Sequence, residues 1–115
     1  MDTISFEDFI KLEIRIGKIL SAEKIENSNK LLKLQVDFGV SEDSGQPKIL
    51  QIVSGIAEFY APESLIGKKF PFVINLEPRV LRGVESQGMI MAATADGQAV
   101  LLSPDKETPP GSIVK

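Results

Sequence analysis

The feature that most constrains this chain is an unbroken alternation of apolar and polar side chains over residues 32–38. The apolar positions are Leu32, Leu34, Val36 and Phe38, and the polar positions between them are Lys33, Gln35 and Asp37. A period of two places every apolar side chain on one face of a β-strand. The pattern therefore predicts an antiparallel sheet with one face on the core and the other on the surface.

The same reasoning places the remaining elements along the chain. Ser5 begins a short N-terminal helix, with Ile4 and Phe9 spaced as a hydrophobic staple. Gly17 allows a bulge or strong bend within the first strand. The expected strands are 12–25, 32–38, 49–53, 70–76, 89–93 and 99–102, with a short helix at 61–67 and an irregular tail at 103–115.

Three strands, one helix and two further strands follow the order of an OB-fold barrel. We therefore predict a single all-β domain over residues 1–115. It has a five-stranded OB barrel, a short N-terminal helix, one helix between strands 3 and 4, and an extra C-terminal strand and tail. OB folds bind oligonucleotides with strands 2 and 3 and with the 1–2 and 4–5 loops. These loops are residues 26–30 and 77–87 here.

Composition argues against catalysis. The 115 residues include no cysteine and no histidine, which removes thiolate nucleophiles and the commonest general acid–base and metal ligand. We expect no catalytic residues, no metal and no cofactor. No apolar run is long enough to cross a membrane, and residues 1–7 do not resemble a signal peptide. The sequence therefore predicts a cytoplasmic protein without membrane contact.

The 4–5 loop holds the best candidates for a nucleic-acid site. Arg79 and Arg82 are two of three arginines in the chain. Pro78 stiffens the start of the loop, and Gly83 allows a tight bend. A guanidinium group can hold a phosphate with two hydrogen bonds. The alternative is that the arginines pair with acidic neighbours, Glu77 and Glu85.

Further polar residues surround these loops. Lys30 lies beside the 1–2 loop, whereas Lys33 lies on the polar strand face, where solvated lysine is ordinary. Asn75, Ser86 and Gln87 offer groups that could read a base edge or a ribose hydroxyl. The net charge of −3 requires a basic site to be local. With six Phe, one Tyr and no Trp, base-stacking platforms are not evident, which favours recognition of folded RNA.

Several segments together resemble a known family. They are SFEDF at 5–9, LEIRIG at 12–17, KLLKL at 30–34, VSGI at 53–56 and NLEPRVLRGVESQGM at 75–89. They are similar to the tRNA-binding domain found at the C-terminus of many methionyl-tRNA synthetases and in free-standing structure-specific tRNA-binding proteins. The family often has a basic residue where this chain has Glu77 or Val80, which predicts modest affinity.

The resemblance implies an OB fold, a homodimer and tRNA binding without base-sequence preference. It implies that the tRNA contacts are made at Lys30, Ser54, Asn75, Arg79, Arg82 and Ser86. The implied partners are tRNA, a second copy of the chain and the catalytic domain of methionyl-tRNA synthetase. Apolar residues outside the minimal barrel are the candidates for the dimer contact, namely Phe6, Phe9, Ile10, Ile113 and Val114.

Two questions stay open at the level of sequence. A peptide-binding secretion chaperone of the same fold is the alternative function, and such a protein would bind through an apolar groove without salt dependence. That type usually lacks the strings at 53–55 and 85–89, so it ranks second. The chain suits either a complete small protein or a domain of a synthetase.

Overall fold

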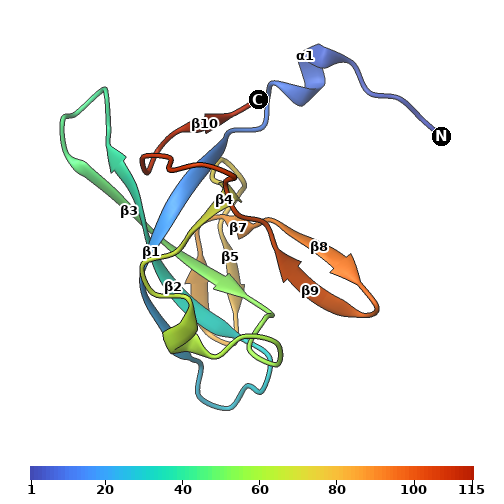
Figure 1. Ribbon diagram of the computed structural model, residues 1–115, viewed down its shortest axis with the longest axis vertical. Helices are drawn as coiled ribbons and strands as arrows, with labels where there is room; N and C mark the ends of the chain where they lie inside the picture. Colours follow the sequence, from blue (N-terminus) through green and yellow to red (C-terminus); the bar gives the residue numbers. More distant parts are fainter.

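The computed structural model describes residues 1–115 and is built mostly of β-strands, as predicted (Figure 1). Helix α1 spans Phe6–Phe9 and a 3-10 turn, η1, spans Pro62–Ser64. The long strands are β1 (Ile14–Lys24), β2 (Leu32–Val40), β3 (Pro47–Ser54) and β4 (Lys69–Val73). The short strands are β5 (Arg79–Leu81), β6 (Val84–Ser86), β7 (Met89–Ile90), β8 (Ala92–Ala95), β9 (Gln98–Leu101) and β10 (Ile113–Val114).

Strand β1 organises the main sheet because it pairs with different neighbours along its length. The sheet order is β3-β2-β1-β4-β7, and β10 adds to β1. The first half of β1 pairs with β4, and the second half pairs with β2. A register shift between Ile19 and Ser21 bends the strand. The sheet therefore curls into the partly open barrel expected for an OB fold, with the β8–β9 hairpin projecting from it (Figure 1).

The alternating residues of β2 form the core, as the pattern predicts. Leu32, Leu34 and Val36 are 0% exposed, and Phe38 is 4% exposed. The Phe38 ring meets Phe72 of β4 edge to face, with centroids 5.4 Å apart. Full burial of each such side chain stabilises the fold by about 1.5–3 kcal/mol. The packing of β2 against β4 therefore closes the centre of the barrel.

Two local signals were also correct, at the N-terminal helix cap and at one hairpin turn. The Ser5 hydroxyl accepts a hydrogen bond from the Asp8 amide at 3.0 Å and caps α1. Asp96 and Gly97 form the turn between β8 and β9, with φ angles of 50° and 75°. Both residues lie in the left-handed region, as a type I′ hairpin turn requires.

Three expectations need correction. The bend in β1 falls at Leu20 and not at Gly17, whose neighbours pair regularly with β4. The helix expected at 61–67 is only the 3-10 turn η1. The fifth strand expected at 89–93 divides into β7, which stays in the main sheet, and β8, which leaves it. Strand propensity alone does not show where a strand leaves one sheet for another.

Gly17 has a packing role instead, and this generates a stability prediction. A Cβ at Gly17 would lie 2.5 Å from Val36 Cγ1 and 2.6 Å from the Phe38 ring. Gly17→Ala should therefore lower the free energy of unfolding by about 1–3 kcal/mol, measured by urea denaturation. Gly55→Ala is the matched control, because its Cβ would meet only a Lys30 backbone oxygen at 4.0 Å. Equal stability of the two variants would contradict this account.

Candidate nucleic-acid interface

Residues 77–87, which were expected to form the loop between strands 4 and 5, contain an ordered β-hairpin. Strands β5 and β6 pair Arg79 with Ser86 and Leu81 with Val84. Arg82 and Gly83 form the two-residue turn, with φ angles of 51° and 79°. This is again the type I′ geometry, in which asparagine or glycine is the usual first residue. An arginine in the left-handed region costs about 1 kcal/mol, so Arg82 is an unusual choice for the turn.

Two side chains attach the hairpin to the edge of β3, namely Ser86 at the end of β6 and Gln87, which follows it. The Ser86 hydroxyl accepts from the Val53 amide at 2.9 Å and donates to the Gly88 carbonyl at 2.9 Å. The Gln51 amide donates to Gln87 Oε1 at 2.8 Å, and the Gln87 amide donates to the Gln51 carbonyl at 2.7 Å. The backbone of β3 is thus satisfied largely by side-chain oxygens on this edge.

Gly88 completes this closure. A Cβ at Gly88 would lie 2.6 Å from the Val73 carbonyl oxygen and 2.9 Å from Ile52 Cδ1. Only glycine allows the chain to pass this closely between β4 and β3. Ser86 itself is 4% exposed, so its hydroxyl lies inside the barrel wall. The Ser86 hydroxyl and the Gln87 Oε1, considered above for reading bases, are occupied by these internal bonds.

Asn75 likewise makes internal contacts. Its Oδ1 accepts from the Glu13 amide at 2.8 Å, and its Nδ2 donates to the Lys11 carbonyl at 2.6 Å. These bonds tie the segment between α1 and β1 to the end of β4. The residues joined are 62 and 64 positions apart, so no sequence pattern near Asn75 indicates them.

The arginines of the hairpin, in contrast, are exposed and free. The structure contains ion pairs at Lys11–Asp8, Arg15–Glu13, Lys33–Glu23 and Lys69–Glu107, and none of them involves Arg79 or Arg82. The pairing with Glu77 and Glu85 that was the alternative for these arginines is not formed. Two guanidinium groups therefore extend from a hairpin whose base is fixed to β3.

Lys30 and Ser54 lie at the same end of the barrel as the base of this hairpin. Ser54 pairs with Leu32 across β2 and β3, and Lys30 precedes Leu32 by two residues. Ser54 is half-buried and Lys30 is exposed. Because Ser86 bonds to Val53 and pairs with Arg79, Arg79 lies next to this end of β3. Lys30, Ser54 and Arg79 thus flank the exit of β3, whereas Asn75 lies at the end of β4.

Lys33 does not join this group. Its ammonium nitrogen lies 2.7 Å from a Glu23 carboxylate oxygen on the neighbouring strand. The structure thus supports the ordinary interpretation of Lys33 as a solvated, charge-paired residue on the polar strand face. No group of three or more histidine, cysteine, aspartate or glutamate residues is placed to hold a metal ion. No helix is long and apolar enough to cross a membrane.

The curled barrel and its strand order define an OB-fold domain. A family model described as "Putative tRNA binding domain" matches residues 14–113. The chain therefore belongs to this tRNA-binding domain family.

Individual relatives agree with that membership. The methionine–tRNA ligase of Archaeoglobus fulgidus is 53% identical over 113 residues, which is 98% of this chain and 16% of that protein. The crystal structure of a MetRS related protein from Pyrococcus horikoshii superposes with a TM-score of 0.89 at 40% identity, covering 100% of both chains. The chaperone CsaA of Bacillus anthracis superposes with a TM-score of 0.84 at 30% identity, covering 99% and 100%. The chain spans about one sixth of the ligases it matches.

The internal bonds of Ser86 generate a second stability prediction. Ser86→Ala removes the acceptor of the buried Val53 amide and should cost about 1–3 kcal/mol of unfolding free energy. Ser64→Ala is the control, because that exposed hydroxyl bonds only to the nearby Ala61 carbonyl. The control should change stability by less than about 0.5 kcal/mol in the same urea titration. A Ser86 variant as stable as its control would mean that the hydroxyl does not close the barrel.

Proposed function

We propose that this domain binds folded tRNA through its backbone, without chemistry of its own. The observation that carries the proposal is the pair of free guanidinium groups, Arg79 and Arg82, on a hairpin fixed to the edge of β3. Membership of the tRNA-binding domain family supports tRNA as the ligand. The absence of histidine and cysteine supports a binding role over catalysis.

The proposed contacts divide into two groups. Arg79 and Arg82 bind phosphate oxygens with their forked donors, and Lys30 adds a point charge beside them. Ser54 offers a hydroxyl at the same end of β3 and contacts a sugar or phosphate. Backbone contacts of this kind fix an RNA in place without reading its sequence, because every nucleotide presents the same phosphate. Recognition then depends on the shape of the folded RNA.

Asn75 and Ser86 act as positioning residues in this proposal. Ser86 fixes the arginine hairpin against β3, and Asn75 fixes the segment before β1 against the end of β4. Their contribution to tRNA binding is indirect, because the hydrogen-bonding groups proposed to face the RNA belong to Lys30, Ser54, Arg79 and Arg82.

The domain can serve as an appendage of methionyl-tRNA synthetase or as a free-standing tRNA-binding protein. In both settings it raises the affinity for tRNA, and aminoacylation itself belongs to the catalytic domain of the synthetase. We propose that this activity takes place in the cytoplasm, as the sequence predicts. The similarity to relatives of both kinds supports each setting.

A peptide-binding chaperone is the second candidate, because the fold also superposes closely on the chaperone CsaA. The two functions differ in their response to salt. Phosphate contacts release counterions, so tRNA affinity falls steeply as salt concentration rises. Peptide binding in an apolar groove lacks this dependence. A salt titration with folded tRNA, unstructured RNA and an apolar peptide therefore separates them.

The arginine hairpin gives the sharpest test of the proposal. Arg79→Ala and Arg82→Ala should each weaken tRNA binding by about tenfold, as expected when a charged hydrogen bond is removed. Each should lower the slope of log affinity against log salt by about one unit. Arg82→Asn should also weaken binding, yet it should be at least as stable as the parent, because asparagine tolerates the left-handed turn. Filter binding and urea denaturation measure the two effects.

Two controls accompany these variants. Lys33→Ala should leave the salt slope unchanged, because the Lys33 ammonium is already paired with Glu23. Arg82→Lys should restore part of the charge contribution but not the forked geometry. If both alanine variants bind tRNA like the parent, with the same slope, the phosphate role of the hairpin is wrong and the chaperone function is favoured.

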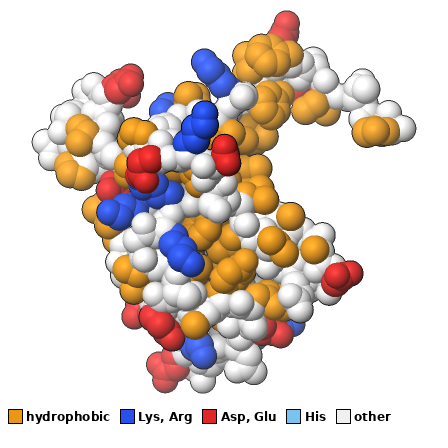
Figure 2. All heavy atoms as spheres, in the orientation of Figure 1, with side chains coloured by type: hydrophobic (Ala, Val, Ile, Leu, Met, Phe, Trp, Pro, Cys, Tyr) orange, Lys and Arg blue, Asp and Glu red, His pale blue; other side chains and the backbone are white.

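The proposal includes a homodimer formed through the N-terminal helix and the C-terminal strand. Phe6 is 74% exposed, Ile10 is 56% exposed and Ile113 is 51% exposed. Helix α1 extends away from the barrel with its hydrophobic side chains uncovered (Figures 1 and 2). Exposed apolar clusters of this kind mark contact surfaces. Phe9 and Val114, which the sequence analysis adds to this group, lie on the same two segments.

Sedimentation equilibrium at micromolar concentration should therefore show a dimer. Phe6→Ser with Ile10→Ser should shift the chain to a monomer, because both substitutions remove apolar surface that a partner would cover. The control is Val100→Ser, since Val100 is also exposed, at 42%, but lies on the projecting β8–β9 hairpin. A parent chain that sediments only as a monomer would remove the dimer from the proposal.

A further inference from the structure

A second basic surface lies outside the arginine hairpin. It borders an open cavity of about 740 Å³ between the segment that follows η1, strand β4 and the tail segment 103–108. Ligand pockets have volumes of about 300–1,000 Å³, so this cavity is large enough to receive one. Four lysines border it, namely Lys18, Lys68, Lys69 and Lys106. We call this region the lysine cavity.

The charge of the lysine cavity is opposite to that of the whole chain. Its four lysines face only two acidic residues, Asp105 and Glu107, which leaves a local net charge of +2. The whole chain has a net charge of −3. Figure 2 shows Lys and Arg side chains along one side of a hollow with a hydrophobic floor. A local cationic patch on an acidic domain marks a place where anions are attracted.

Strand pairing forces two of these charges together. Lys18 of β1 lies directly opposite Lys69 of β4. Like charges in this position destabilise an antiparallel pair. Glu107 offsets one of them, because its carboxylate lies 2.5 Å from the Lys69 ammonium. The hydrogen bond and the charge of Lys69, aided by Lys18, hold the pKa of Glu107 below its usual value.

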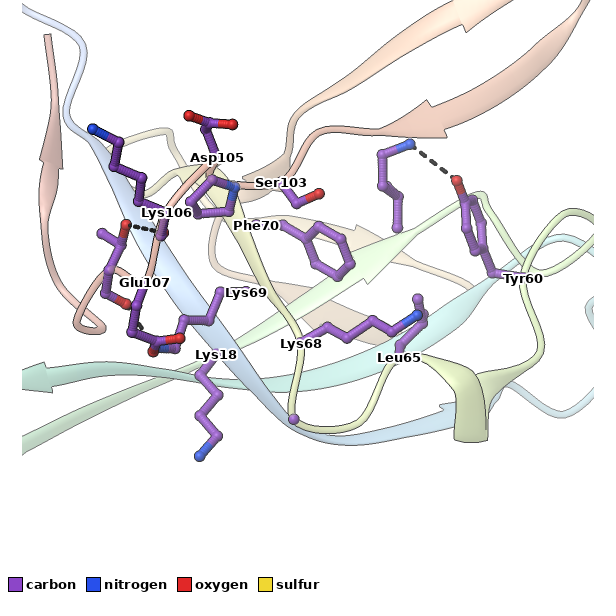
Figure 3. Close-up of a pocket in the computed structure, with 14 residues that line it drawn as sticks. Lys18, Tyr60, Leu65, Lys68, Lys69, Phe70, Ser103, Asp105, Lys106 and Glu107 are labelled. Atoms are coloured by element: carbon purple, nitrogen blue, oxygen red, sulfur yellow. Dashed lines mark hydrogen bonds and ion pairs between the residues drawn. The ribbon is translucent and has the colours of Figure 1, made fainter.

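Three lysines of the cavity remain without an ion pair. Lys18, Lys68 and Lys106 take part in none of the four pairs of the structure. Figure 3 shows their ammonium groups on different sides of the cavity, with Lys68 directed toward Leu65 and away from Lys18 and Lys106. A single compact anion would need converging donors. Spread charges instead suit several phosphates along one strand.

We infer that the lysine cavity is a second contact surface for the phosphates of the bound tRNA. This inference rests on the proposed function and extends it to a part of the domain that no loop motif indicated. The cavity is lined by Lys69 and Phe70 of β4 and by the tail segment, whereas the arginine hairpin is fixed to β3 by Ser86. The domain is 42 Å long, a distance along which a duplex presents roughly 25 phosphates. The inference requires that one tRNA lying across the barrel meets both surfaces.

The test compares two triple variants of equal charge. The cavity variant replaces the three unpaired lysines of the cavity by Lys18→Gln, Lys68→Gln and Lys106→Gln. Lys69 is kept because its ammonium donates hydrogen bonds to Glu107 and to the Thr108 carbonyl. The control combines Lys24→Gln, Lys48→Gln and Lys115→Gln, which lie outside the cavity and, like the cavity lysines that are replaced, take part in no ion pair. The salt slope of tRNA binding is measured for both, with the oligomeric state checked by sedimentation.

We expect the cavity variant to lower the salt slope by about two to three units, because each phosphate that it no longer neutralises accounts for about one unit. The control should change the slope by less than about one unit. Stability of the cavity variant should not fall, because the charge opposite Lys69 is removed. Combination with Arg82→Ala should reduce the slope further, since distant sites act additively.

Other outcomes overturn the inference in distinguishable ways. If the arginine variants lower the slope while the cavity variant matches its control, the cavity does not contact tRNA and the proposed function stands. If the parent binds tRNA no better than unstructured RNA, the proposed function fails and the inference fails with it. Calorimetry with inorganic triphosphate is the third arm. One result would assign the cavity to a free anion instead of tRNA. In that result, triphosphate binds the parent but not the cavity variant, and the salt slope of tRNA binding is the same for the cavity variant and its control.

Discussion

The exposed edge of β3 is closed by side chains in place of a continuous backbone ladder. The Ser86 hydroxyl accepts a hydrogen bond from the Val53 amide of β3, and the side-chain oxygen of Gln87 accepts one from the Gln51 amide. Unpaired amides on a sheet edge are costly when buried and hazardous when open. Because Gly88 lets the chain approach β3 and β4 together, these two oxygens can complete the barrel. The position of the β5–β6 hairpin depends on this closure.

A firmly attached hairpin changes what its arginines can do. A guanidinium group on a mobile loop loses conformational entropy when it binds, and this loss reduces affinity. Here the backbone of Arg79 lies in a strand, and that of Arg82 is held in a left-handed turn. The turn would be more stable with asparagine or glycine. The phosphate contact proposed for Arg82 would account for an arginine at this strained position.

The charges of the domain are unevenly distributed, which the proposed function would use for selective binding. An acidic chain, with a net charge of −3, repels nucleic acid in general. Free cations are gathered on the hairpin and around the lysine cavity, and several others, such as Lys33, are paired with carboxylates. Strand β1 contributes Lys18 to the lysine cavity, and the hairpin is fixed to β3. Under the proposed function, a folded RNA would contact both cationic regions, whereas a short strand would contact one.

The sequence by itself determined the features that depend on neighbouring residues. The alternation at 32–38 fixed which face of β2 is buried, the Ser5 hydroxyl fixed the start of α1, and Asp96–Gly97 fixed a hairpin turn. The tertiary structure alone decided the roles of Ser86 and Asn75, whose partners lie 33 and 62 residues away. It also decided the hairpin at 79–86, because Arg–Gly is not a usual type I′ pair. Long-range hydrogen bonds leave no periodic trace in a sequence, so polar residues that close a barrel resemble polar residues that bind a ligand.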